Sequence, residues 1–231
     1  MTDRMAAGDG SYTGTRLNVG CGQSPVPGWY NYDNSITVRL ARLPDWLLSI
    51  IAFMLRLAGM GGAVNWEFMA ACRAKDIRYA QASRLPHADG SVDAIYSCHM
   101  FEHLDAVDAS AFLAECRRVL KRDGVLRLVV PDTGFEASNV TLKGLPWHVF
   151  VARLDAYTER QRGLREKIKF MIVGFRGHYA WYNPEALANT VRAKGFSDVR
   201  LLEFGETTIP EPGQLDLAER GVGNIWLEAR Q

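Results

Sequence analysis

The stretch RLNVGCGQ, residues 16–23, decides the fold of this chain. A short apolar run that enters a Gly-x-Gly turn is typical of a buried strand followed by a loop, and neither Gly20 nor Gly22 carries a Cβ that would keep a ligand from the backbone. Eleven residues after Gly22, Asp33 ends a second short apolar run that begins at Trp29. An acidic residue in this place can accept hydrogen bonds from the two hydroxyls of a ribose. The pattern therefore predicts a nucleoside site.

The composition is typical of one compact catalytic domain, residues 1–231. Hydrophobic residues make up 48% of the chain, which is enough to bury a full core. The 27 basic and 26 acidic side chains nearly balance, so nucleic acid is not favoured as a partner. The four cysteines lack Cys-x-x-Cys spacing, and the N-terminus does not resemble a signal peptide. We therefore expect a reduced, cytoplasmic protein.

Strands and helices alternate along the chain. Between two apolar runs, apolar positions that recur at three and four residues predict a helix opened by Asp108 and closed by Gly124. A second helix is predicted after Asn183, an N-cap followed by Pro184, with Gly195 as its stop. This order predicts an α/β, Rossmann-like, doubly wound, mostly parallel seven-stranded sheet with an antiparallel C-terminal strand, plus helical insertions. The predicted strands lie near residues 17–19, 29–33, 77–80, 92–97, 124–130, 199–204 and 224–229.

Four motifs in the same order carry a resemblance to a known family: Leu17–Gly22, Leu85–Asp93, Phe101–Leu104 and Arg118–Gly124. With these motifs the chain resembles class I S-adenosylmethionine-dependent methyltransferases, and specifically the short members described as predicted methyltransferases of surface-glycan gene clusters. The resemblance covers about residues 16–133 and 178–204. It implies S-adenosyl-L-methionine as cofactor and methyl transfer to a hydroxyl, or a similar nucleophile, of a saccharide or small-molecule acceptor.

The resemblance also implies a set of cofactor contacts. The glycine loop would contact the methionine portion of the cofactor, Asp33 would hold the ribose hydroxyls, and the end of the fourth strand would line the sulfonium. The adenine position holds Gln81 where the family usually has an acidic side chain, so a charge-assisted hydrogen bond would be lost. The implied cofactor-binding residues are Asn18, Gly20, Cys21, Gly22, Asp33, Gln81, Ala82, Ser97, Cys98 and His99.

Methyl transfer depends mainly on holding donor and acceptor in attack geometry, and a hydroxyl acceptor is helped by a base. The candidate bases are His99, His103 and His178, although a histidine near a helix start is often a packing or capping residue. The resemblance places Tyr179, Trp181 and Tyr182 beside the active-site mouth, where their rings could stack on a flat acceptor. No cluster at metal-ligand spacing is visible in the sequence, so we expect no metal.

Simpler interpretations remain open for the same residues. The two glycines could make an ordinary tight turn, Asp33 could cap a turn, and the cysteines could pack as small apolar residues. A dinucleotide-binding dehydrogenase is disfavoured because its third fingerprint glycine is Pro25 here. The segment Ser24–Gly28 also leaves little room for a helix before the second strand, as in the glycan-cluster type of methyltransferase.

Two segments, residues 36–76 and 143–182, are predicted helical insertions or cap segments within the domain. The first contains an apolar run, Trp46–Ala58. On a helix, Asp45, Ser49, Ala52 and Arg56 would fall on one narrow stripe, and nearly all other residues are large and apolar. The run is too short for a confident membrane span. It could be buried in the core, form a dimer contact, cover an apolar acceptor as a lid, or lie in a membrane surface.

The second insertion carries a basic cluster, which could bind a phosphate or carboxylate of the acceptor or form a solvated helix face. Its members are Arg160, Arg162, Arg165, Lys167 and Lys169. Two other functions stay open besides methyl transfer. One is a catalytically degenerate S-adenosylmethionine-binding protein, and the other is a membrane-associated scaffold that uses the Trp46–Ala58 helix.

Overall fold

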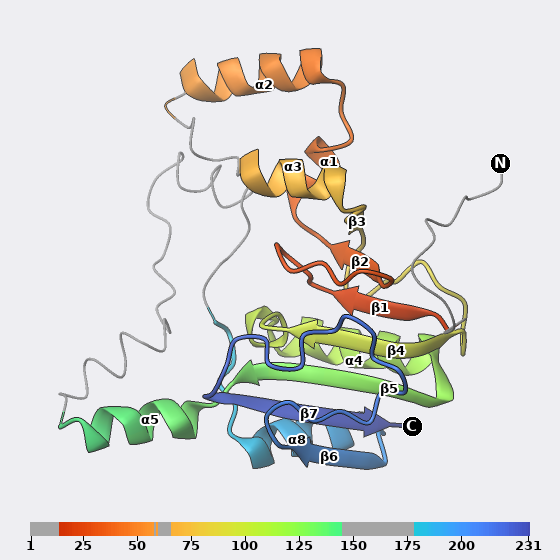
Figure 1. Ribbon diagram of the computed structural model, residues 1–231, viewed down its shortest axis with the longest axis vertical. Coiled ribbons are helices and arrows are strands. Elements are labelled where there is room, and N and C mark those ends of the chain that lie inside the picture. The colour runs from red at the N-terminus through yellow and green to blue at the C-terminus, as the bar shows by residue number, and fades with distance from the viewer. Residues whose placement is uncertain (1–13, 58, 60–65, 145–177) are drawn as a thin grey trace.

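The computed structural model describes residues 14–57, 59, 66–144 and 178–231, so the predicted basic cluster lies outside the described residues. Seven strands form one sheet in the order β3-β2-β1-β4-β5-β7-β6 (Figure 1). The strands are β1 (Arg16–Val19), β2 (Tyr30–Asp33), β3 (Arg78–Tyr79), β4 (Val92–Cys98), β5 (Leu120–Pro131), β6 (Asp198–Leu202) and β7 (Asn224–Arg230).

The sheet is parallel except at β7. Strands β1 to β5 pair in parallel, whereas β7 runs antiparallel to both of its neighbours, β5 and β6. The prediction of a Rossmann-like, mostly parallel sheet with an antiparallel C-terminal strand is confirmed. Because the carboxyl ends of parallel strands meet at one edge, this edge is where such sheets bind ligands.

Helices α4 (Ala106–Val119) and α8 (Pro184–Arg192) pack on one face of the sheet, where their apolar residues share one core cluster with strand residues. The predicted cap Asn183 is confirmed, since its side chain accepts from Ala186 N. The predicted opening and closing residues of α4 are wrong. Asp105 caps the helix instead, accepting from the N–H groups of Val107 and Asp108, and the chain is already extended at Leu120.

Gly124 lies inside β5, where it has a packing role. A Cβ at this position would lie 3.0 Å from the carbonyl oxygens of Lys121 and Val92. The glycine therefore marks a close approach of two backbones, which the sequence pattern cannot tell from a helix stop.

Loops cover the other face of the central strands. The connection between β1 and β2 contains no helix, as the short Ser24–Gly28 segment predicts. Trp29 from this connection packs in a second core cluster with Tyr96 and Trp226 of the sheet and with Ile209 of the segment between β6 and β7. Two chain segments far apart in sequence therefore close this face next to the carboxyl edge.

The insertion between β2 and β3 folds as three helices: α1 (Ile36–Leu40), α2 (Asp45–Leu57) and α3 (Trp66–Ala74). Helix α2 confirms the predicted apolar helix, and Figure 1 shows it standing apart from the sheet, beyond α3. Leu48 is its one buried residue, so the interpretation of α2 as a core helix is wrong. Within the described ranges, no helix combines the length and the apolar character needed to cross a bilayer.

A buried ion pair joins β5 to β7. Arg127 Nη1 donates to Glu228 Oε1 over 2.7 Å, and both side chains are almost fully buried. Thr207 Oγ1 and Thr208 N also donate to the Glu228 carboxylate, which satisfies it inside the sheet. Separating the two side chains would leave a buried charge without a partner, which is costly. The pair therefore holds β7 in register with β5, and this register places Asn224 at the start of β7 opposite Pro131.

Candidate active site

A cavity of about 510 Å³ opens at the carboxyl edge of the sheet. Such a volume is in the range of small-molecule sites. Its walls come from the glycine turn after β1, the ends of β2 and β4, and the segment before β7. The lining residues are Asn18, Gly20, Cys21, Gly22, Gln23, Ser24, Asp33, Asn34, Cys98, His99, Met100, His103, Glu219 and Arg220.

The glycine turn is held against the end of β2. The N–H groups of Gly20 and Cys21 both donate to Tyr32 O, over 2.8 and 3.0 Å. Gly20 has φ +72°, and a Cβ there would lie 2.7 Å from Met100 Cβ, so only glycine fits. Gly22 has φ +48° and nothing within 4 Å of the place of a Cβ. The turn thus leaves an open cradle for a ligand above Gly22.

Asp33 faces this cradle with its carboxylate already oriented. Its Oδ2 accepts from Gly22 N over 3.1 Å, and its Oδ1 accepts from Ser35 N over 2.8 Å. Each carboxylate oxygen has a further lone pair that can accept from a ligand hydroxyl. The N–H groups of Gly20, Cys21 and Gly22 already donate within the protein, so these three residues offer a ligand carbonyl oxygens and space.

Asn18 lines the cavity but has a structural task. Its Nδ2 donates to Ser24 O over 2.9 Å and to Asn31 Oδ1 over 3.0 Å. Asn31 in turn donates to Val26 O and accepts from Val26 N. These buried amides hold the helix-free connection between β1 and β2 in place, and with it the rim of the cavity.

His99 occupies a strained position directly after β4. Its φ is +50°, in the left-handed region that a non-glycine residue adopts rarely. Asn224 Nδ2 donates to Gly221 O, which leaves Asn224 Oδ1 to accept from His99 Nε2 over 2.8 Å. Burial lowers the pKa of His99, so the ring is neutral at pH 7, with its proton on Nε2 and its Nδ1 facing Glu102. Both ring nitrogens are thus directed at protein groups.

Glu102 is a buried carboxyl group in the short helix η1 (Phe101–His103). It is 1% exposed, and no described residue donates a hydrogen bond to either of its carboxylate oxygens. His99 Nδ1 lies 3.5 Å from Oε1. Burial raises the pKa of Glu102 to about 7. A group of this kind beside a ligand cavity is a functional candidate.

The aromatic segment 178–182 lies next to η1. Tyr179 N and Ala180 N both donate to Glu102 O, over 2.9 and 3.2 Å. The ring centroid of His178 lies 4.6 Å from that of His103 and 4.4 Å from that of Trp181. Tyr182, by contrast, is buried in the core, where it stacks on Phe101. His178 therefore lies against the cavity residue His103, and Trp181 lies against His178. Tyr182, which was predicted to contact the acceptor, packs in the core instead.

Three predicted cofactor residues lie outside the cavity lining. Ser97 is buried in β4, because alternation along a strand turns it away from its neighbour Cys98. Gln81 and Ala82 follow β3 in a turn where Arg84 N donates to Gln81 O. Cys98 does line the cavity, and burial raises the pKa of its thiol to about 12, so it is uncharged at neutral pH.

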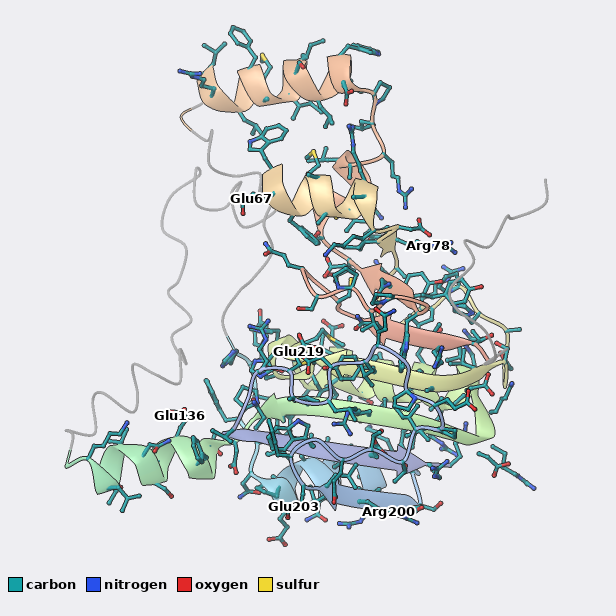
Figure 2. All side chains as sticks on the ribbon, viewed as in Figure 1. Glu67, Arg78, Glu136, Arg200, Glu203 and Glu219 are labelled. Carbon is teal, nitrogen blue, oxygen red and sulfur yellow. The ribbon has the colours of Figure 1, made fainter. Side chains whose placement is uncertain are left out.

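Sequence reasoning missed two charged residues of the cavity, Glu219 and Arg220. They come from the segment between β6 and β7, and Figure 2 shows Glu219 beside the end of β4. Tyr96 of β4 donates its hydroxyl proton to Glu219 Oε2 over 2.7 Å, which fixes this contact. No motif marks these residues, and they lie about 200 positions after the glycine turn, so only the fold reveals them.

Comparisons with known proteins add a family match. Residues 61–128 match a family model described as a methyltransferase domain. No curated protein matches the chain.

Solved structures with a related fold were also found. A methyltransferase of Thermotoga maritima, described as a possible histamine N-methyltransferase, is 18% identical, with 95% of this chain and 83% of that chain covered and a TM-score of 0.48. A second, from Archaeoglobus fulgidus, is 17% identical, with 95% and 87% covered and a TM-score of 0.45. A Haloferax volcanii complex of a methyltransferase with the Trm112 activator gives 14% identity, 98% and 84% coverage and a TM-score of 0.46.

The family match and the seven-stranded sheet with its antiparallel β7 bear out the resemblance that the four motifs carry. Both findings support a class I S-adenosylmethionine-dependent methyltransferase.

Proposed function

We propose that this methyltransferase acts on a hydroxyl, or a similar nucleophile, of a saccharide or small-molecule acceptor. One observation carries the proposal. A single cavity has the glycine turn and Asp33 on one wall and the imidazole of His103 on another, and His103 in turn contacts the aromatic segment 178–182. This arrangement separates a nucleoside side from an acceptor side.

On the donor side, Asp33 holds the ribose hydroxyls and the open cradle at Gly20 to Gly22 takes the methionine portion. Arg220, which lines the same cavity, is the best partner for the methionine carboxylate, because the N–H groups of Gly20, Cys21 and Gly22 already donate within the protein. Gln81 and Ala82 remain the proposed adenine contacts. When bound, S-adenosylmethionine supplies a methyl group on a positively charged sulfur, which needs no further activation.

On the acceptor side, the protein has to orient a nucleophile and accept its proton. His99 is poorly suited to accept that proton, because its Nε2 is bonded to Asn224 and its Nδ1 faces Glu102. His103 lines the cavity and His178 lies against it, so these two are the better candidates. Half-exposed Tyr179 and the ring of Trp181 would contact the acceptor.

The donor site is tested by calorimetric titration with S-adenosylmethionine and S-adenosylhomocysteine. Asp33→Ala removes two charge-assisted hydrogen bonds to the ribose, so we expect affinity to fall at least about tenfold. Arg220→Ala should weaken both ligands by a smaller factor, because the methionine carboxylate stays partly hydrated. Asp123→Asn alters an exposed carboxylate in β5 that lines no part of the cavity, and it is the matched control.

Asp33 also accepts from two backbone N–H groups, so thermal unfolding of each variant must accompany the titration. Asp33→Asn keeps the shape of the side chain and separates loss of charge from collapse of the turn. Wild-type protein that binds neither ligand would sink the proposal, and so would equal affinities in wild type and a folded Asp33→Ala.

Two narrower proposals accompany this one. The glycan-cluster subtype remains a prediction, supported by the helix-free connection between β1 and β2. A cytoplasmic location is supported by the four cysteines, all of which are free.

A second candidate function, attachment to a membrane surface, is favoured by the apolar outer face of α2. Trp46, Ile50, Phe53, Met54 and Leu57 are all exposed there. Liposome co-sedimentation tests this function. Phe53→Glu is the variant, because the side chain of Phe53 is 61% exposed and its replacement does not disturb the core. Absence of wild-type protein from the pellet, with neutral and with anionic lipid, would exclude this function.

A further inference from the structure

One cluster of side chains combines three metal-ligating groups. Glu102, His103 and His178 each offer one ligand atom, and these atoms all lie within 4.8 Å of one another. Glu102 and His103 are neighbours in η1, whereas His178 comes from a segment 75 residues further on. This separation explains why no ligand spacing was visible in the sequence.

We propose that Glu102, His103 and His178 bind a divalent transition-metal ion, with Zn²⁺ as the best match. Two imidazole nitrogens and one carboxylate oxygen form the donor set of open catalytic zinc sites, in which a fourth position is left for water or substrate. Mg²⁺ and Ca²⁺ prefer all-oxygen sites and fit this set less well.

The backbone fixes the two halves of the cluster relative to each other. Tyr179 N and Ala180 N donate to the carbonyl oxygen of Glu102, which ties the start of segment 178–182 to η1. The ring centroids of His103 and His178 lie 4.6 Å apart, and the ring of Trp181 packs against His178. In a tetrahedral zinc site, ligand atoms lie about 3.4 Å apart. Small side-chain rotations therefore suffice to close the cluster around an ion.

The burial of Glu102 is independent support for a bound cation. Its carboxyl group is 1% exposed, and neither oxygen accepts a hydrogen bond from the described residues. A buried carboxylate without donors is costly unless a cation or a proton neutralises it, and a bound metal ion does so. Glu102 is thus better explained as a ligand than as a packing residue.

The location gives the ion a use, which rests on the proposed function. His103 belongs to the metal-ligating cluster and also lines the cavity, so an acceptor hydroxyl in the cavity could reach the open coordination position. A coordinated hydroxyl loses its proton more easily, and here the proton passes to water. The oxygen then forms a bond to the methyl carbon as the carbon–sulfur bond breaks, leaving a neutral thioether. In this arrangement His103 and His178 act as ligands and not as bases.

Metal binding is measured on the full chain without a histidine tag, treated with a chelator and then titrated with Zn²⁺ by calorimetry. We expect one ion per chain in the wild type, and an affinity at least about tenfold lower in Glu102→Gln and in His178→Ala. Two control variants lie outside the cluster. Glu185→Gln repeats the chemical change of Glu102→Gln, and His87→Gln removes an imidazole as His178→Ala does. Both controls should bind Zn²⁺ as tightly as the wild type. Circular dichroism confirms that each variant is folded.

Absence of stoichiometric Zn²⁺ binding, or equal affinity in Glu102→Gln and His178→Ala, would overturn the proposal. Co²⁺ gives a second measurement: visible bands of a nitrogen and oxygen site are expected, whereas a thiolate charge-transfer band would place the ion on Cys98 and refute the assignment. Asp33→Ala should keep Zn²⁺ affinity while losing S-adenosylmethionine. Failure of the metal site is therefore distinguishable from failure of the donor site.

Discussion

Helices α2 and α4 are similar in length and both have an apolar face, but they present that face in opposite directions. In α4 the apolar residues Phe112 and Leu113 are fully buried against the sheet. In α2 the polar stripe faces α3 across a cavity of about 440 Å³, lined by Asp45, Ser49 and Ala52 among others, while the large apolar residues are exposed. The comparison teaches that burial inside this chain determines the orientation of α4 but not that of α2.

The largest effect is expected in α4. Phe112→Ala removes a 0% exposed ring from the main core and should lower the free energy of unfolding by about 3–5 kcal/mol. Urea denaturation measures this change, with Val107→Ala, at an exposed position of the same helix, as the control. A loss below about 1 kcal/mol would mean that α4 packs no more tightly than α2.

A smaller effect is expected in α2. Leu48→Ala truncates the single buried residue of this helix and should cost about 2 kcal/mol, the lower end for such a change. Leu48 packs in a smaller core cluster with Phe68 and Met69 of α3 and also lines the cavity between the two helices, so less packing is lost than in the main core. If the loss equals that of Phe112→Ala in the same urea series, the contrast between the helices fails.

The smallest effect should come from the outer face of α2. Phe53→Glu is expected to change the free energy of unfolding by no more than about 0.5 kcal/mol, because the ring is already in water. A strongly destabilised variant would show that this face is covered by another part of the chain or by a second copy.

The fold could be predicted from the sequence because each strand carries its own signal. The run at residues 124–130 is apolar enough to be buried wherever it pairs, and the run at 16–19 is marked by the glycine turn that follows it. Helix boundaries were harder to predict. Asp105 and Asp108 are equally good caps by residue type, and only the backbone decides between them.

The candidate site divides in the same way. The glycine turn and Asp33 are local in sequence and were predicted, and the structure places both at one cavity. Arg220 and the pairing of Glu102 with His178 depend on contacts between segments far apart in the chain. The residue pattern within one segment does not predict contacts between distant segments.

The position of β7 has a consequence for biosynthesis. It is the last strand along the chain, yet it lies inside the sheet, between β5 and β6. A nascent chain on the ribosome that lacks it exposes the unpaired edges of both neighbours, and unpaired edges invite aggregation. Asn224, which receives the hydrogen bond from His99, arrives with the same strand. Folding of the sheet and completion of the active site therefore both wait for the synthesis of β7.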